Sequence, residues 1–444
     1  MTPDLLLRRA STAPGFERDL AIERGRIVAQ PGPGHHLEID VEGRPVLPGL
    51  TDHHIHLLAT AAARDSLDCS PAGLAAGGGL AAVLRDARAR RPEGWLRGVG
   101  YDVAASGPLD RGTLDGLGVG PVRVQDRTGI LWMLDGAGLA EVLPADPADW
   151  PAGVERDGAG QATGVLTRLD GWLGERVPRR APDLEGLGAW LATRGVTSVT
   201  DAGAGNGPAE LAVLAAAGLP QRVTAMTRDP EVTAPEGISL GPVKILLDDA
   251  DLPSLDDLAA RVDAAHAAAR AVAVHSVSAA SLVLALAAGV GARDRIEHAS
   301  LVPDDVLPVL VEAGPLVVVQ PALVRTRGDR YLAEVPVEDH RGLHRLGSFV
   351  GAGLRVRAGS DAPYGDPDPW LGVAAAADRR TAGGQVLGAA EALTPGGAVR
   401  LWCDTLVDDV VVLDAGWDRL GDSPPVHAVV VRGLWAPAGS QRVP

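Results

Sequence analysis

Lysine is nearly absent from this chain of 444 residues, although lysine and arginine together number 41. The single lysine, Lys244, lies in an apolar run (residues 241–248, Gly-Pro-Val-Lys-Ile-Leu-Leu-Asp) that is typical of a buried strand. Unlike a guanidinium, an amine can lose its proton when desolvated and can react with carbon dioxide as a nucleophile. Because an unpaired lysine is rarely fully buried, this position favours a functional lysine over one that escaped replacement by chance.

Other scarcities exclude whole classes of protein. The two cysteines, Cys69 and Cys403, lie far apart, which argues against a disulfide framework or a cysteine-type zinc site. No run of about 18 apolar residues and no signal-like N-terminal segment occurs, so we expect no membrane association and a cytoplasmic location. The net charge of −16, with no basic cluster that contains aromatics, argues against nucleic-acid binding.

Both ends of the chain are rich in short β-type runs. The composition, 46% hydrophobic and 22% charged, is that of an ordinary globular protein. Strand-like runs occupy residues 4–8, 19–23, 26–29, 37–41, 409–414 and 427–431. We therefore expect the termini to meet in one small β-sandwich domain built from residues 1–48 and 405–444.

In the middle of the chain, β-type runs alternate with alanine-rich helical runs, the pattern of βα units. Eight such runs occupy residues 49–56, 196–200, 222–226, 243–248, 271–275, 295–298, 316–320 and 354–361. The predicted fold class is α/β, with a (β/α)8 TIM barrel over residues 49–404. The long interval at about 70–190, which has its own strand-like run at 121–125, is predicted to be an insertion that caps the substrate pocket.

Side chains able to bind a metal ion gather at the ends of the predicted strands. Alternate residues of a strand share a face, so the first strand presents a His-x-His pair to the barrel interior. The carboxyl ends of barrel strands converge on one mouth, where catalytic sites lie. The six candidates are His54, His56, Lys244, His275, His298 and Asp361.

This set suffices for two divalent ions, expected to be zinc. In the predicted arrangement the His-x-His pair and Asp361 hold one ion, and His275 and His298 hold the other. Lys244, carbamylated by carbon dioxide, and a hydroxide would bridge the two ions. Metal binding lowers the pKa of water to about 7, and Asp361 would act as the general base.

Several motifs together resemble a known family. They lie at residues 48–57 (Pro-Gly-Leu-Thr-Asp-His-His-Ile-His-Leu), 243–248, 274–275, 295–298 (Arg-Ile-Glu-His) and 359–363 (Gly-Ser-Asp-Ala-Pro). In these the chain resembles the amidohydrolase superfamily of metal-dependent hydrolases, in particular the branch that contains N-substituted formamide deformylase (amidohydrolase family 3). The resemblance implies a barrel with a small β-sandwich, and hydrolysis of C–N bonds in amides or ring amides. The sequence departs from that branch after His275, where Ser-Val-Ser-Ala replaces the usual Ala-Ile-Gly-Asp.

Three further residues are candidate substrate contacts. Arg127 could hold a substrate carboxylate or form a structural salt bridge. Asp248 could contact substrate or simply begin a loop. Tyr364 follows the eighth predicted strand, where pocket walls are built.

The function expected from these residues is metal-dependent hydrolysis of an amide-type C–N bond in a small molecule, by a homodimer. One alternative is a mononuclear deaminase of the same superfamily, although that chemistry usually has a glutamate where this chain has Ser278. Another alternative is a non-catalytic, metal-binding relative.

Overall fold

The structure is a computed structural model that describes residues 4–32, 34, 36–178, 181–404, 408–422 and 424–437. The predicted domain boundary at residue 405 lies outside the described residues. The chain forms two compact units, one of residues Met1–Leu57 with Leu184–Pro444 and the other of residues Leu58–Asp183. No helix among the described residues is long and apolar enough to cross a membrane.

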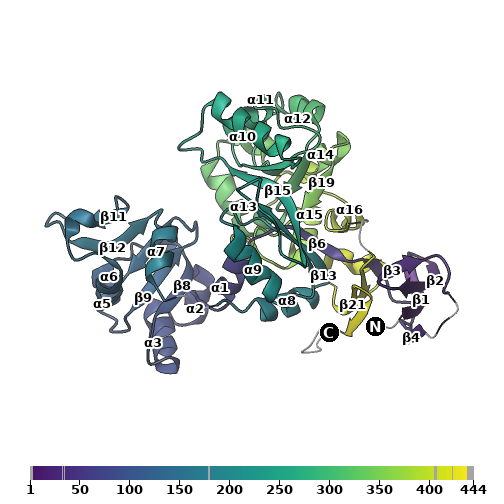
Figure 1. Cartoon of the computed structure of the whole chain (residues 1–444), viewed down its shortest axis with the longest axis horizontal. Coiled ribbons are helices and arrows are strands. Elements are labelled where there is room, and N and C mark those ends of the chain that lie inside the picture. The colour runs from purple at the N-terminus through teal and green to yellow at the C-terminus, as the bar shows by residue number, and fades with distance from the viewer. Residues whose placement is uncertain are drawn as a thin grey trace. The chain divides into compact units, whose positions relative to one another are not determined.

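The first unit contains an eight-stranded parallel sheet whose strands follow one another in chain order, surrounded by helices (Figure 1). The strands are β6 (Leu50–Ile55), β13 (Val196–Asp201), β14 (Arg222–Thr227), β15 (Ile238–Leu246), β16 (Val272–Ser276), β17 (Arg295–His298), β18 (Leu316–Val319) and β19 (Val356–Ala358). These strands overlap the eight predicted runs and confirm the predicted fold class, although β15 begins five residues earlier than the run predicted at 243–248. Most of their residues are apolar or β-branched and buried, as expected for strands covered on both faces.

Hydrogen bonds between the first strand and the segment after the last strand close the barrel. The backbone N–H of Asp361 donates to the carbonyl of His54 at 2.7 Å, and that of His56 donates to the carbonyl of Ala362 at 2.9 Å. The buried carboxylate of Asp52 accepts the N–H of Ser360 at 2.9 Å. The closure therefore lies directly beside three of the predicted metal ligands.

Helices cover the outside of the barrel, except after β14. They are α8 (Leu184–Ala192), α9 (Pro208–Ala216), α10 (Leu255–Ala267), α11 (Ala279–Ala287), α12 (Leu307–Ala313), α13 (Ala322–Glu334), α14 (Gly347–Gly351), α15 (Pro369–Asp378) and α16 (Pro395–Arg400). Serine side chains cap the first turns of two of these helices, Ser254 for α10 and Ser278 for α11. Residues 228–237, all of them described, contain no helix, and a cavity of about 500 Å³ lies beside β15 at this place.

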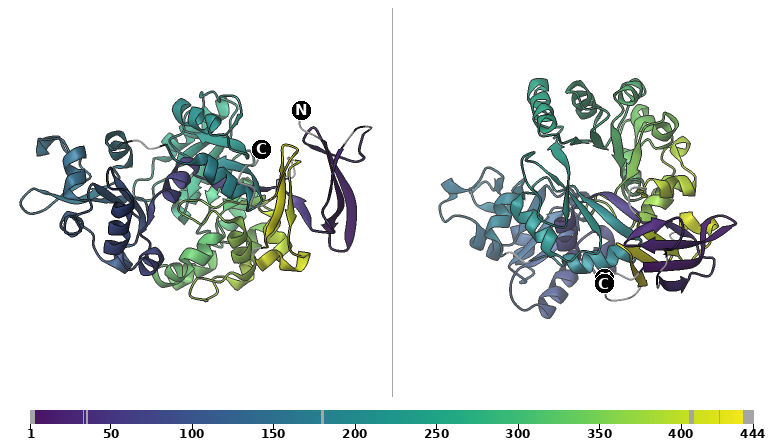
Figure 2. Two further views of the ribbon diagram at one scale, coloured as in Figure 1. Left: turned by 90° about the horizontal axis from the view of Figure 1, so that it is seen from below. Right: turned by 45° about the vertical axis from the view of Figure 1, so that its right-hand side comes forward.

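The chain termini build two small sheets that pack together, as predicted. One has the order β3-β2-β1-β4 and the other the order β22-β21-β20-β5. Their strands are β1 (Asp4–Ala13), β2 (Phe16–Glu23), β3 (Arg26–Val28), β4 (His36–Asp40), β5 (Val46–Pro48), β20 (Val410–Leu413), β21 (Val426–Val431) and β22 (Leu434–Pro437). Leu5 and Ile22 of the first sheet share one buried cluster with Val412 and Val430 of the second. The N-terminal and C-terminal strands lie side by side in both views of Figure 2.

A buried aspartate joins this sandwich to the barrel. The carboxylate of Asp409, which is fully buried, accepts two hydrogen bonds from Arg222 of β14, at 3.0 and 3.1 Å. It also accepts the backbone N–H of Arg432 at 2.8 Å. We expect Asp409→Ala to lower the free energy of unfolding by about 1–3 kcal/mol, because the guanidinium of Arg222 and the N–H of Arg432 lose their buried acceptor.

Chemical denaturation would measure this effect. The matched control is Asp422→Ala, which removes an exposed ion pair with Arg419 and should cost less than about 1 kcal/mol. Equal effects of the two substitutions would show that Asp409 does not help to hold sandwich and barrel together.

The second unit is a six-stranded sheet with its own helices and two buried apolar clusters. Its strand order is β11-β12-β10-β9-β8-β7. The strands are β7 (Leu67–Asp68), β8 (Leu96–Tyr101), β9 (Val122–Asp126), β10 (Leu131–Leu134), β11 (Val154–Arg156) and β12 (Ala162–Thr167). The helices are α2 (Pro71–Ala76), α3 (Leu80–Arg90), α4 (Val103–Ser106), α5 (Arg111–Asp115), α6 (Gly136–Val142) and α7 (Asp170–Arg176), and α1 (Leu57–Arg64) begins at the unit boundary. That this unit caps a substrate pocket stays a prediction.

Candidate metal centre

The first strand of the barrel buries His54 completely. Its Nδ1 lies 2.5 Å from Oε2 of Glu297 in β17, which is also fully buried. A carboxylate can only accept, so Nδ1 carries the proton of this hydrogen bond. The other ring nitrogen, Nε2, has no hydrogen-bond partner among the described residues and lies 3.3 Å from Oδ1 of Asp361. His54 thus presents Nε2 to the barrel mouth, in the orientation that metal-binding histidines adopt.

His298, the last residue of β17, is held in the same way. Its Nδ1 lies 2.8 Å from Oε1 of Gln320, which directly follows β18. With Nδ1 as the donor to this amide oxygen, Nε2 is left available as a ligand. Burial lowers the pKa of His298 well below its usual value, and the nearby His275 lowers it further. The imidazole is therefore neutral, which is the form that binds a metal ion.

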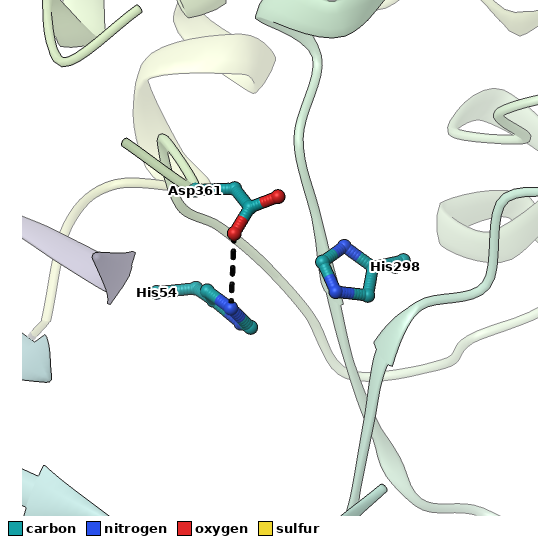
Figure 3. A group of neighbouring side chains, drawn as sticks. All are labelled: His54, His298 and Asp361. Atoms are coloured by element: carbon teal, nitrogen blue, oxygen red, sulfur yellow. Dashed lines mark ion pairs between the residues drawn. The ribbon is translucent and has the colours of Figure 1, made fainter. Parts of the chain in front are cut away.

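Asp361 completes a compact group with these two histidines (Figure 3). The ligand atoms of His54, His298 and Asp361 lie within 4.8 Å of one another. Burial alone would raise the pKa of Asp361, but the adjacent imidazoles of His54 and His56 hold that pKa well below its usual range. His298 and Asp361 also adopt left-handed backbone conformations, with φ of 73° and 55°. Such conformations are uncommon outside glycine and cluster at functional sites.

The other three predicted ligands lie beside this group. Nε2 of His56 is 3.2 Å from Oδ1 of Asp361, and the ring of His275 is 4.4 Å from that of His298, centroid to centroid. Burial lowers the pKa of His275 to about 4, with a further contribution from the charge of Lys244. The amine of Lys244 has no hydrogen-bond partner among the described residues, and the side chain is only 2% exposed.

This donor set fits a divalent cation. Two imidazoles and one ionised carboxylate converge, and Nε2 of His54, which has no hydrogen-bond partner among the described residues, lies in the same group. Burial lowers the pKa of Lys244, which favours the neutral amine that reaction with carbon dioxide requires. The compact group joins His54 and Asp361, which were predicted to bind one ion, with His298, which was predicted to bind the other. How the six ligands divide between two ions therefore stays a prediction.

Several residues of this centre carried no role in the sequence-based prediction. Glu297 and Gln320 orient the two histidines, and Arg295 donates to Glu297 at 2.7 Å and to the backbone carbonyl of His53 at 2.7 Å. Asp52 accepts the N–H groups of His54 and Ser360, and burial raises its pKa to about 6. A signal was present in the sequence, since Glu297 is an acidic residue inside a short predicted strand and Gln320 directly follows the apolar run of residues 316–319.

The candidate substrate residues lie in different surroundings. Arg127, in the unit of residues 58–183, forms an ion pair with Asp102 at 2.8 Å. This is the structural salt bridge that was considered as the alternative to a substrate contact. Asp248 is exposed in the turn after β15, where it accepts the backbone N–H of Ala250. Tyr364 lies beside the metal-binding group, with its ring 5.6 Å from that of His56. A substrate contact by any of the three stays a prediction.

The fold and this group of residues together define a barrel protein with a candidate divalent-metal centre. A model of the amidohydrolase family matches residues 37–405. The chain therefore belongs to the amidohydrolase family, which confirms the resemblance that the motifs indicated. Its general class is that of a metal-dependent hydrolase.

More distant similarities agree with this assignment. The N-substituted formamide deformylase of Arthrobacter pascens is 31% identical over 137 residues, which cover 29% of this chain and 25% of that protein. The chain thus matches only a quarter of that relative's length. An uncharacterised metal-dependent hydrolase from Pyrococcus horikoshii has the same fold, with a TM-score of 0.72 at 20% identity over 93% of this chain and 98% of the other. A second from Pyrococcus furiosus gives a TM-score of 0.68 at 19% identity over 90% and 93% of the two chains.

Proposed function

We propose that this protein hydrolyses a non-peptide, amide-type C–N bond of a small molecule, with two zinc ions bound by His54, His56, His275, His298, Asp361 and carbamylated Lys244. The observation that carries the proposal is the convergence of His54, His298 and Asp361, in which both histidines have Nδ1 engaged by a buried acceptor. An arrangement that fixes two imidazoles with Nε2 facing one carboxylate is difficult to explain by packing alone.

Each residue has a task in this reaction. A bound divalent cation supplies Lewis-acid polarisation of the substrate carbonyl and lowers the pKa of water. Asp361, kept ionised by His54 and His56, accepts a proton from the attacking water and donates it to the leaving nitrogen. The amide and water thereby give a carboxylic acid and an amine. Glu297 and Gln320 keep the two imidazoles in the orientation that binding requires.

Metal removal tests the proposal. We expect the purified protein to contain two zinc ions per chain, to lose hydrolysis of a panel of N-formyl and N-acetyl amines and amino acids after dialysis against a chelator, and to regain it with zinc. His298→Ala should remove at least one ion, because a neutral imidazole held by Gln320 is lost as a ligand. Metal analysis by mass spectrometry and an amine-release assay measure both effects.

The matched control is His427→Ala, since His427 lies on β21 and pairs with Asp414 at the surface. This variant should keep its zinc and its activity. One ion per chain together with deamination of amino-substituted rings would favour the deaminase instead, and a protein that binds no metal would contradict the proposal.

A further inference from the structure

Helix α13 carries an arginine and a tyrosine toward the turn that holds Asp361. Arg327 and Tyr331 are four residues apart and therefore share one face of the helix. The guanidinium of Arg327 lies near enough to the Tyr331 hydroxyl to influence its pKa. The guanidinium of Arg327 also donates to the backbone carbonyl of Tyr364 at 2.6 Å, and the N–H of Tyr364 donates to the carbonyl of Asp361 at 2.8 Å. Arg327 thus reaches the segment that begins at the proposed general base.

Arg327 differs from the other arginines of its helix in having no acidic partner among the described residues. Arg325 pairs with Asp378 at 2.7 Å and Arg330 pairs with Glu334 at 2.5 Å. Among the described residues no carboxylate forms an ion pair with Arg327, although acidic residues outnumber basic ones by 57 to 41 in the chain. A guanidinium has five N–H donors, and the contacts with Tyr364 and Tyr331 leave others unused.

The wall around Arg327 is suited to a polar ligand. The chain has three tyrosines, and two of them, Tyr331 and Tyr364, border this place. Tyr364 packs edge-on against His56, with the ring centroids 5.6 Å apart, and is 40% exposed, so it is open to solvent beside this metal-ligand candidate. Burial raises the pKa of Tyr331, which keeps its hydroxyl protonated and able to donate. Arg327 and Tyr331 therefore offer neighbouring donors next to the segment that carries Asp361.

We infer that Arg327, with Tyr331, binds a carboxylate group of the substrate, so that the preferred substrates are amides with an anionic group close to the scissile bond, such as N-acyl amino acids. A planar guanidinium matches a carboxylate in shape and charge and can bind it through two parallel hydrogen bonds. This inference rests on the proposed amide hydrolysis and specifies its substrate class.

Paired substrates test the inference with the zinc-loaded full-length protein. The panel consists of N-formyl and N-acetyl amino acids, each as the free acid and as the neutral carboxamide. We expect lower KM for the acids, and we expect Arg327→Gln to raise KM for the acids about 10- to 100-fold while the carboxamides change less than about twofold. Arg327→Lys, which keeps the charge, should restore part of the preference. Arg330→Gln, one turn away on the same helix, should change neither class.

The outcomes separate this inference from the proposed function. Hydrolysis without preference for acids, or equal effects of Arg327→Gln on acids and carboxamides, would overturn the inference and leave amide hydrolysis standing. Calorimetric binding of the acids that depends on Arg327, without turnover of any panel member, would support the subsite and contradict the proposed reaction. A protein that neither binds nor hydrolyses the panel would contradict both.

Discussion

Lys244→Arg should abolish hydrolysis and reduce the zinc content of the protein. Lys244 is 2% exposed, and its amine has no hydrogen-bond partner among the described residues. Arginine is larger, stays charged and cannot form a carbamate, so it would place an unpaired cation where the proposal requires an anionic bridge. If the transition state loses several kcal/mol of stabilisation by the metal ions, kcat/KM falls by about 100- to 1,000-fold or more. Amine release and metal analysis would measure the two effects.

Lys244→Met distinguishes loss of the amine from damage to the fold. Methionine keeps the length of the side chain and removes the polar nitrogen, whose burial disfavours the charged form. We expect this variant to lose hydrolysis as well, whereas its metal-free form should unfold with a free energy no lower than that of the parent protein. Retained hydrolysis in Lys244→Met would show that the amine is not needed.

The modification itself can be observed. Carbon-13-labelled bicarbonate added to the zinc-loaded protein should give a carbamate signal in the NMR spectrum that Lys244→Met lacks. Zinc-loaded, active protein without this signal would mean that Lys244 acts unmodified.

The sequence predicted the barrel well because its evidence is local and repeated. Each strand is a short buried run, and eight such runs in series have few architectures open to them. The metal-binding candidates followed from the same argument, since a strand such as Arg295–His298 ends in a polar residue at a known edge of the sheet. The location of residues within the predicted strands was therefore enough to predict both the barrel and its candidate metal ligands.

Contacts between distant segments could not be predicted in the same way. The alternation of a regular strand predicts opposite faces for Glu297 and its neighbour His298. In the structure both lie against His54, which is 243 positions before Glu297 in the chain. Arg327 lies on a helix, where one arginine among three looks like any other until its partners are known. Such roles depend on contacts that form only when the barrel closes, and these contacts cannot be predicted from a single sequence.

Glu297→Gln should weaken both zinc binding and the fold, although it changes one atom. Oε1 of Glu297 accepts from Arg295 at 2.7 Å, and Oε2 accepts from His54 at 2.5 Å. Burial would raise the pKa of Glu297, but Arg295 and His54 hold it well below its usual range, so the carboxylate is ionised. Glutamine has one acceptor oxygen, and its NH2 group would face the second donor.

In either orientation, the glutamine amide can accept a hydrogen bond from only one of the two donors, Arg295 or His54. If its oxygen accepts from Arg295, the NH2 group faces Nδ1 of His54, and the imidazole must carry its proton on Nε2, where the metal would bind. If the oxygen instead accepts from His54, the NH2 group faces the guanidinium, and Arg295 loses a buried counter-charge. Loss of one partner of a buried ion pair costs about 3–5 kcal/mol of stability, and loss of the acceptor behind a metal-binding histidine weakens metal affinity about 10- to 100-fold.

Chelator competition and chemical denaturation would measure the two losses separately. Glu334→Gln is the matched control, because Glu334 forms an exposed pair with Arg330 on α13 and should change stability by less than about 1 kcal/mol and zinc affinity not at all. A Glu297→Gln protein that is destabilised but binds zinc as tightly as the parent would assign Glu297 to the fold alone. Weakened zinc binding in a protein that remains folded would show that this buried carboxylate orients His54 for the metal.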